Sequence, residues 1–149
     1  MANQDAVGRS GPEFEMVVER GKVREFARAT GSSSPAYFGV PDPVVPPTFL
    51  TTSVFWQPPS TADLYRELAM DPRRVLHGEQ EYLFTGVPPR AGTTLHARTT
   101  VEEIYEKEGR RGGTMTFVVT RTDFTDDDGV IVAQARSTAI ETGRPPKAS

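Results

Sequence analysis

The sequence predicts an α+β fold, a single domain in which an antiparallel sheet wraps around a central helix. Three observations support this prediction. The first third of the chain carries apolar residues at helical spacing, the stretch 46–56 is the most apolar in the protein, and the second half alternates with a period of two. A sheet made by consecutive hairpins leaves one apolar face uncovered, and a long apolar helix is its natural cover.

The length of 149 residues fits one domain and leaves little room for a second. Residues 1–13 are small and polar, which predicts a flexible N-terminal arm. Residues 14–142 form the predicted domain, and residues 143–149 are predicted to be a disordered tail. The domain opens with residues 14–18, which fit either a short strand or an extended lead-in.

The first predicted helix covers residues 19–29 and ends at Gly31, a residue that commonly terminates helices. Its apolar face has the spacing i, i+3, i+4 and i+7, in Val23, Phe26, Ala27 and Thr30. The proline-rich and serine-rich segment that follows, residues 31–47, has no regular period and predicts a long loop.

Residues 46–56 predict a buried helix, although their β-branched residues leave a strand as the alternative. Residues 61–70 predict a second short helix, with Thr61 as its N-cap. Alternation then predicts four strands joined by turns, at residues 76–84, 95–101, 115–124 and 130–141.

Composition excludes several classes of function. The net charge is -3 and no basic block suggests a nucleic-acid or anionic-membrane partner. The chain has no cysteine and only two histidines, so no disulfide, thiolate or histidine-rich metal site is expected. No cofactor is predicted. The polar N-terminus predicts no signal peptide, and no apolar run has the ~20 residues of a membrane span. These features fit a cytoplasmic protein.

Three segments in this order resemble MaoC-like (R)-specific hydratases and dehydratases, in particular their N-terminal MaoC dehydratase subgroup. Residues 23–31 look like the opening helix of that family, and residues 46–50 look like the start of its hot-dog helix. The strand at 77–82, followed by residues 89–95, is similar to the same subgroup. The resemblance covers residues 14–142 and implies one hot-dog domain acting in fatty acid metabolism.

The sequence departs from this family where the family carries its catalytic residues. Catalytic members resemble Gly-Asp-x-Asn-Pro-x-His after the first helix, with the aspartate and histidine activating water. Here Ser32 stands in place of the aspartate and Tyr37 in place of the histidine, and neither is a base near neutral pH. The family's His-Gly-Met at the start of the central helix becomes Pro46-Pro47-Thr48, and Pro47 has no N–H to donate.

The resemblance therefore implies the non-catalytic half of a dimeric (R)-3-hydroxyacyl-thioester dehydratase or (R)-enoyl-thioester hydratase, with little activity without a catalytic hot-dog partner. Such a half shapes the tunnel for an acyl chain bound to coenzyme A or to an acyl carrier protein. The predicted substrate-binding residues are Tyr37, Pro47, Thr48, Phe49 and Arg90. Tyr37 is equally well explained as a loop anchor, and Arg90, the candidate for a phosphate contact, is more simply a surface residue.

Two other functions remain open at this stage. The first is a self-sufficient homodimeric hydratase or thioesterase, which would need an unfamiliar base. His77 is the candidate, with Glu79 and Glu81 expected on its face of the strand, and Asp42 is the carboxylate nearest the central helix. The second is a module that binds an acyl, polyketide or steroid-like ligand without turning it over. The remaining histidine, His96, is expected to be an exposed sheet residue.

Overall fold

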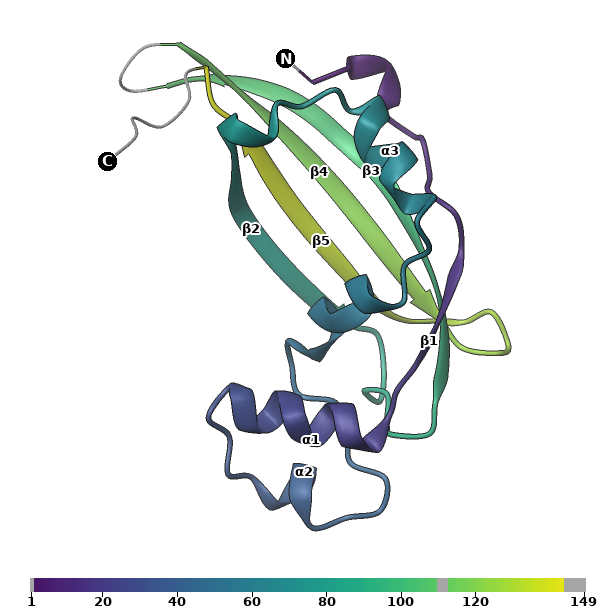
Figure 1. Ribbon diagram of the computed structural model, residues 1–149. Coiled ribbons are helices and arrows are strands. Elements are labelled where there is room, and N and C mark those ends of the chain that lie inside the picture. The colour runs from purple at the N-terminus through teal and green to yellow at the C-terminus, as the bar shows by residue number, and fades with distance from the viewer. Residues whose placement is uncertain (1, 110–112, 144–149) are drawn as a thin grey trace.

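The computed structural model describes residues 2–109 and 113–143, and its centre is one five-stranded antiparallel sheet (Figure 1). The strand order is β1-β3-β4-β5-β2, so the strands adjacent in sequence, β1 and β2, lie at opposite edges. The strands are β1 (Phe14–Val17), β2 (Val75–Phe84), β3 (Thr94–Glu108), β4 (Thr114–Thr125) and β5 (Ile131–Glu141). All four predicted strands are confirmed, and residues 14–17 are a strand rather than a lead-in.

The helices gather on one face of the sheet and beyond one of its ends (Figure 1). α3 lies across the sheet, η2 lies at its lower end in this view, and α1 and α2 lie beyond η2. Their bounds are α1 (Arg20–Ala29), α2 (Pro35–Phe38), η2 (Phe49–Phe55) and α3 (Thr61–Glu67). Two short 3-10 turns complete the set, η1 (Gln4–Ala6) and η3 (Pro72–Arg74).

The long central helix predicted over residues 46–56 is replaced by the seven-residue 3-10 helix η2. Three consecutive residues of low helix propensity, Thr51 to Ser53, interrupt a longer α-helix, and Pro58 stops its extension. Its last two residues, Val54 and Phe55, are exposed rather than buried. The cover of the sheet is therefore divided between η2 and α3, and neither spans the whole face.

The N-terminal segment is not the flexible arm that its composition predicts. Its backbone pairs with β3, because the N–H of Gly8 donates to the carbonyl of Val101 and that of Gly11 donates to the carbonyl of Thr99, both at 2.9 Å. Ala6 is 1 % exposed and packs in a cluster with α3. Small side chains allow this close approach, so the same composition that suggested flexibility permits packing. The predicted tail lies outside the described residues from position 144 onward.

Two separate apolar clusters fill the inner face of the sheet, which is the face covered by η2 and α3. The larger cluster joins η2 and α1 to the sheet, and the T-shaped contact of Phe26 with Phe49 at 5.6 Å is part of it. The smaller cluster packs Leu64 and Leu68 of α3 against Val101 and Val118. A cavity separates the two clusters, since Leu50 of the larger cluster and Leu68 of the smaller cluster both line it.

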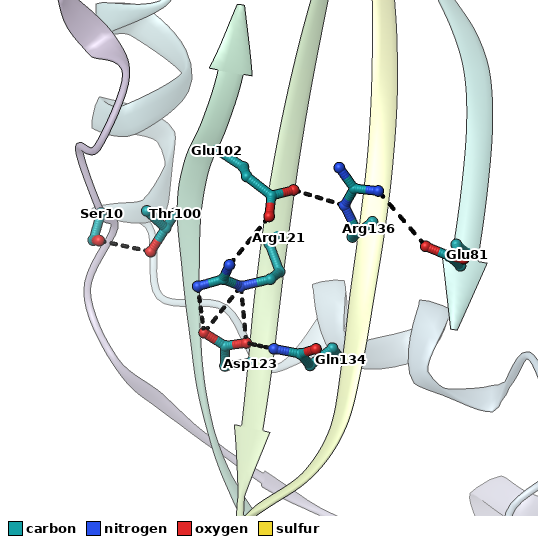
Figure 2. A network of polar contacts seen from close by, with 8 residues as sticks. All are labelled: Ser10, Glu81, Thr100, Glu102, Arg121, Asp123, Gln134 and Arg136. Carbon is teal, nitrogen blue, oxygen red and sulfur yellow. Dashed lines mark hydrogen bonds and ion pairs between the residues drawn. The ribbon is translucent and has the colours of Figure 1, made fainter. Parts of the chain in front are cut away.

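The outer face of the sheet is polar and carries a network of ion pairs across four strands (Figure 2). Glu102 accepts from Arg121 at 3.1 Å and from Arg136 at 2.6 Å, and Arg136 lies 3.8 Å from Glu81 on β2. Arg121 also pairs with Asp123 at 3.0 Å. Because these side chains remain solvated, the network identifies the outer face as the side that does not enclose a ligand.

Candidate functional site

A cavity of about 540 Å³ lies on the inner face, between η2, α3 and the sheet. Its volume falls in the range of small-molecule sites in proteins. The walls come from η2 and its surroundings, from α3 and η3, and from strands β2, β4 and β5. The lining residues are Leu50, Thr51, Ser53, Val54, Tyr65, Leu68, Met70, Pro72, Val75, Gln80, Tyr82, Val118, Thr120, Thr122, Ala135, Ser137 and Ala139.

The cavity exists because the inward-facing side chains of β5 are small. Ala135, Ser137 and Ala139 alternate along this strand and form the floor. Thr122 and Thr120 of β4 lie directly opposite Ala135 and Ser137 and are also short. With no long helix to fill the remaining space, the middle of the sheet stays open.

The cavity opens between the helical cover and the edge strand β2. Val54 of η2 is 57 % exposed and Tyr65 of α3 is 48 % exposed, so both stand at the rim. Gln80, on the inner face of β2, is exposed on the opposite side of the opening. A ligand can therefore enter from the side on which β2 has its free edge.

The lining can bind an apolar chain but holds no group suited to acid–base chemistry. Hydroxyls and one amide are its polar groups, and none of the described lining residues is His, Asp, Glu, Lys or Arg. Tyr65 and Tyr82 are the titratable residues among them, and burial raises the pKa of the Tyr65 phenol above the ordinary 10.0. A phenol that titrates so high is not a general base near neutral pH.

Ser32 and Tyr37, which the sequence analysis aligned with the catalytic pair of MaoC-like enzymes, lie outside this cavity. The hydroxyl of Ser32 accepts from the N–H of Ser34 at 3.3 Å, and Ser34 in turn caps α2. Tyr37 is on α2, half-buried, and packs against the larger apolar cluster. The serines thus shape the turn into α2, and Tyr37 has the contacts of a loop anchor.

The other predicted substrate-binding residues also lie away from the cavity lining. Phe49 is fully buried in the larger cluster, whereas Pro47 and Thr48 are exposed at the start of η2. Arg90 donates to the carbonyl of Asp42 at 3.0 Å and lies 3.7 Å from its carboxylate, so it ties two loops together. The structure does not bring these residues to one site.

His77 is exposed and lies opposite Ala139, on the inner side of β2. The expectation that Glu79 and Glu81 share its face is wrong, because a bulge between His77 and Glu79 reverses the alternation of the strand. Glu79 and Glu81 pair instead with outward-facing residues of β5. No carboxylate of this strand is therefore placed to orient the imidazole.

His96 lies on β3 and is part of a surface cluster of charges. Its Nε2 lies 3.0 Å from the carboxylate of Asp127, and its Nδ1 lies 3.9 Å from Glu15. The hydrogen bond to Asp127 raises the pKa of the imidazole above its ordinary 6.5, and the charge of Glu15 acts in the same direction. The cluster is remote from the cavity lining.

The floor of the cavity is the functional feature that sequence reasoning did not identify. Its signal was present in the strand at 130–141, where every inward position from 133 to 139 is Ala or Ser. A strand whose core-facing positions are all small leaves space that some larger neighbour must fill. The helix predicted over residues 46–56 would have occupied this space, so no cavity was expected there.

Comparison with protein families gives a match to the family described as FAS1-like, dehydratase domain region, over residues 5–135. Among curated proteins, a UPF0336 protein of Streptomyces coelicolor is 36 % identical over 116 residues, covering 72 % of this chain and 76 % of the relative. A UPF0336 protein of Parafrankia is 33 % identical over 156 residues and covers 97 % of both chains.

Among solved structures, a chain of the C-terminally truncated HadBC (3R-hydroxyacyl-ACP dehydratase) complex from Mycobacterium tuberculosis is 29 % identical. The TM-score is 0.73, and the match covers 91 % of this chain and 97 % of that one. A chain of the ChsH1-ChsH2 complex from the same organism has the same fold, with a TM-score of 0.70 at 15 % identity over 97 % of this chain and 89 % of that one. The predicted hot-dog class is confirmed. Within the part of the chain that is described, no helix has the length and apolar character needed to cross a bilayer.

Proposed function

This chain belongs to the FAS1-like, dehydratase domain region family, and we propose that it is the acyl-binding, non-catalytic half of a hot-dog dehydratase or hydratase. The reaction is the reversible loss of water from a (R)-3-hydroxyacyl thioester to give the trans-2-enoyl thioester. In this assignment a catalytic hot-dog partner supplies the acid and base that remove the α-proton and release hydroxide as water. The present chain supplies the walls that hold the acyl chain.

The observation that carries the proposal is a cavity with room for a ligand and no residue to act on it. Four residues separate Ala135 from Ala139, which is about 13 Å along a strand. An extended hydrocarbon advances ~1.25 Å per carbon, given C–C bonds of about 1.5 Å. The floor of the cavity therefore accommodates roughly ten carbons of an acyl chain lying along β5.

The free edge of β2 supports pairing with a second hot-dog domain. β2 is ten residues long, and among the described strands only β5 pairs with it, so its other backbone edge is free. Leu76 and Leu83, which are 50 % and 54 % exposed, lie on it. A long exposed edge with apolar side chains is a ready template for strand addition. Since the cavity opens beside β2, a partner docked on this edge would cover the opening. The similar HadBC chain is part of a complex.

The decisive assay measures hydration of trans-2-enoyl thioesters of several chain lengths, first with this chain alone and then with a catalytic MaoC-like partner. We expect turnover near background for the chain alone and full turnover for the pair. Full activity of the isolated chain would refute the non-catalytic assignment.

The self-sufficient enzyme has weaker support in this geometry. His77 is exposed and lacks a carboxylate of its own strand on its face, and Asp42 is 59 % exposed and engaged with Arg90. His77→Ala tests this alternative directly, since it should leave the activity of the pair unchanged if the partner holds the base. A non-enzymatic module that only binds the acyl ligand would use the same cavity. This alternative is correct if the chain retains the acyl ligand but no hot-dog partner restores turnover.

A further inference from the structure

A row of polar side chains crosses the middle of the cavity floor. Thr120 of β4 lies directly opposite Ser137 of β5, and Ser137 lies directly opposite Gln80 of β2. All three residues line the cavity, and directly opposed side chains on neighbouring strands lie about 5 Å apart. The Nε2 of Gln80 donates to the carbonyl of Arg136 at 3.1 Å, which leaves its Oε1 as an acceptor. Thr120, Ser137 and Gln80 are called the polar row below.

Apolar residues flank the polar row on both sides along the strands. Toward η2, the floor continues with Ala135, and Leu50 lies in the cover. Toward η3, the floor continues with Ala139 and Val118, and Val75 follows on β2. A ligand that lies along β5 therefore meets polar groups of the floor at its middle and small or apolar groups at both ends.

The hydroxyls of the polar row have no partner in the protein. Among the described residues, none forms a hydrogen bond with the hydroxyl of Thr120 or of Ser137. In the next position along the strands, Thr122 and Thr99 satisfy each other at 2.8 Å. From the cover, Ser53 is 8 % exposed and adds a hydroxyl that also lacks a partner in the described chain. Hydroxyls without partners are unfavourable when hydrocarbon covers them, because they lose their hydrogen bonds to water.

We propose that the cavity binds an acyl chain that carries a second oxygen function, a hydroxyl or a ketone, near its middle. The inference rests on the proposed function, since it specifies which class of acyl chain the cavity holds. This oxygen is distinct from the 3-hydroxyl that the reaction removes, because that hydroxyl has to lie at the acid and base of the catalytic partner. An oxygen above the polar row would accept from the hydroxyls of Thr120 and Ser137, since each of them can donate one hydrogen bond.

The place of Ser137 in the strand sets the depth of this oxygen. Ser137 is two residues from Ala135 and two residues from Ala139, which is about 6.6 Å in either direction. At ~1.25 Å per carbon, this distance corresponds to roughly five carbons. The preferred substituent therefore lies close to the midpoint of the roughly ten carbons that the floor accommodates. A plain hydrocarbon chain would instead bury the polar row without an acceptor.

The test measures binding of S-ethyl thioesters to the full chain by isothermal titration calorimetry. These probes lack the pantetheine arm, whose amides are the other groups that could reach the polar row. The plain decanoyl thioester is compared with derivatives that carry one ketone or one hydroxyl, moved stepwise along the chain. We expect a substituent near the middle to strengthen binding roughly tenfold over the plain chain, and one at the far end to give no gain.

The variant T120V/S137A removes both hydroxyls of the polar row with little change in volume. We expect it to lose the tenfold advantage of the mid-chain oxygen and to bind the plain chain at least as well as the natural protein does. The matched control is T138V, whose side chain lies on the outer face of the same strand, and it should keep the full advantage. Circular dichroism verifies that each variant is folded, and S137A alone replaces the double variant if it is not.

Each result bears on the inference. Equal affinity of the natural chain for plain and oxygenated thioesters would overturn it and would leave the acyl-binding function intact. An advantage that survives in T120V/S137A would overturn the polar row as the site of the oxygen. A gain seen only with pantetheine thioesters would assign the row to that arm and would also overturn the inference. Absence of binding by every thioester would overturn the inference together with the acyl-binding function, so the two failures are distinguishable.

Discussion

The guanidinium of Arg74 donates to the buried carboxylate of Glu141 at 2.5 Å, which joins η3 to the last residue of β5. The side chain of Glu141 is 2 % exposed, and its Oε1 also accepts from the N–H of Asp71 at 3.1 Å. Val75, the strand partner of Glu141, lines the cavity. This pair therefore holds together the end of the cavity that lies furthest from η2.

The first prediction concerns this pair. Glu141→Gln removes the charge that compensates Arg74, and we expect the free energy of unfolding to fall by about 2–3 kcal/mol. Denaturation by urea measures the change. Glu106→Gln, on the exposed part of β3, is the control and should be nearly neutral. Equal stability of the two variants would show that the buried pair contributes nothing.

The second prediction concerns the bulge in β2. A Cβ added to Gly78 would lie 2.8 Å from Cδ1 of Ile140 and 3.1 Å from the carbonyl oxygen of Thr138. Gly78→Ala should therefore destabilise the protein by about 1 kcal/mol, because the side chain of Ile140 can move but the backbone cannot. Gly86→Ala, where no heavy atom lies within 4 Å of the added Cβ, is the matched control. Thermal unfolding of both variants provides the comparison.

The third prediction concerns the floor of the cavity. Ala139→Leu places a larger side chain in open space, so stability should change by less than about 1.5 kcal/mol. Retention of long acyl thioesters should fall roughly tenfold, while short ones bind as before. Thr138→Leu places the same side chain on the outer face of β5 and should leave retention unchanged. Isothermal titration calorimetry with thioesters of graded length measures both variants. An equal loss of long-chain binding in both variants would show that the floor of the cavity does not hold the acyl chain.

The fourth prediction concerns pH. The hydrogen bond to Asp127 raises the pKa of His96 above 6.5 in the folded state. The stabilisation is then fully present below the unfolded pKa of 6.5 and is lost as the pH rises through the higher folded value. Asp127→Asn should lower the unfolding temperature at about pH 5–6 and have little effect at about pH 8.

The control for this prediction is Asp128→Asn in the same turn, whose carboxylate forms no contact with His96. An NMR titration of the two histidines observes the pKa directly. A His96 pKa at or below that of a model imidazole would contradict the assigned hydrogen bond.

Local patterns determined a large part of this structure. The spacing of Val23 and Ala27 predicted α1, and the alternation after position 75 predicted four strands, of which β3 extends seven residues beyond its predicted end at 101, to Glu108. These features follow from the sequence because the repeat of a helix or strand dictates which side chains share a face.

The tertiary structure alone decided the features that create the site. The reversal after His77 depends on a bulge, and Gly78 in the sequence permits a bulge without showing that one forms. The burial of Ala6 and the shortness of η2 depend on which distant surfaces are available to pack against. The cavity arises for the same reason. The small residues at 135, 137 and 139 are visible in the sequence, but space remains above them only because neither η2 nor α3 spans the whole face of the sheet.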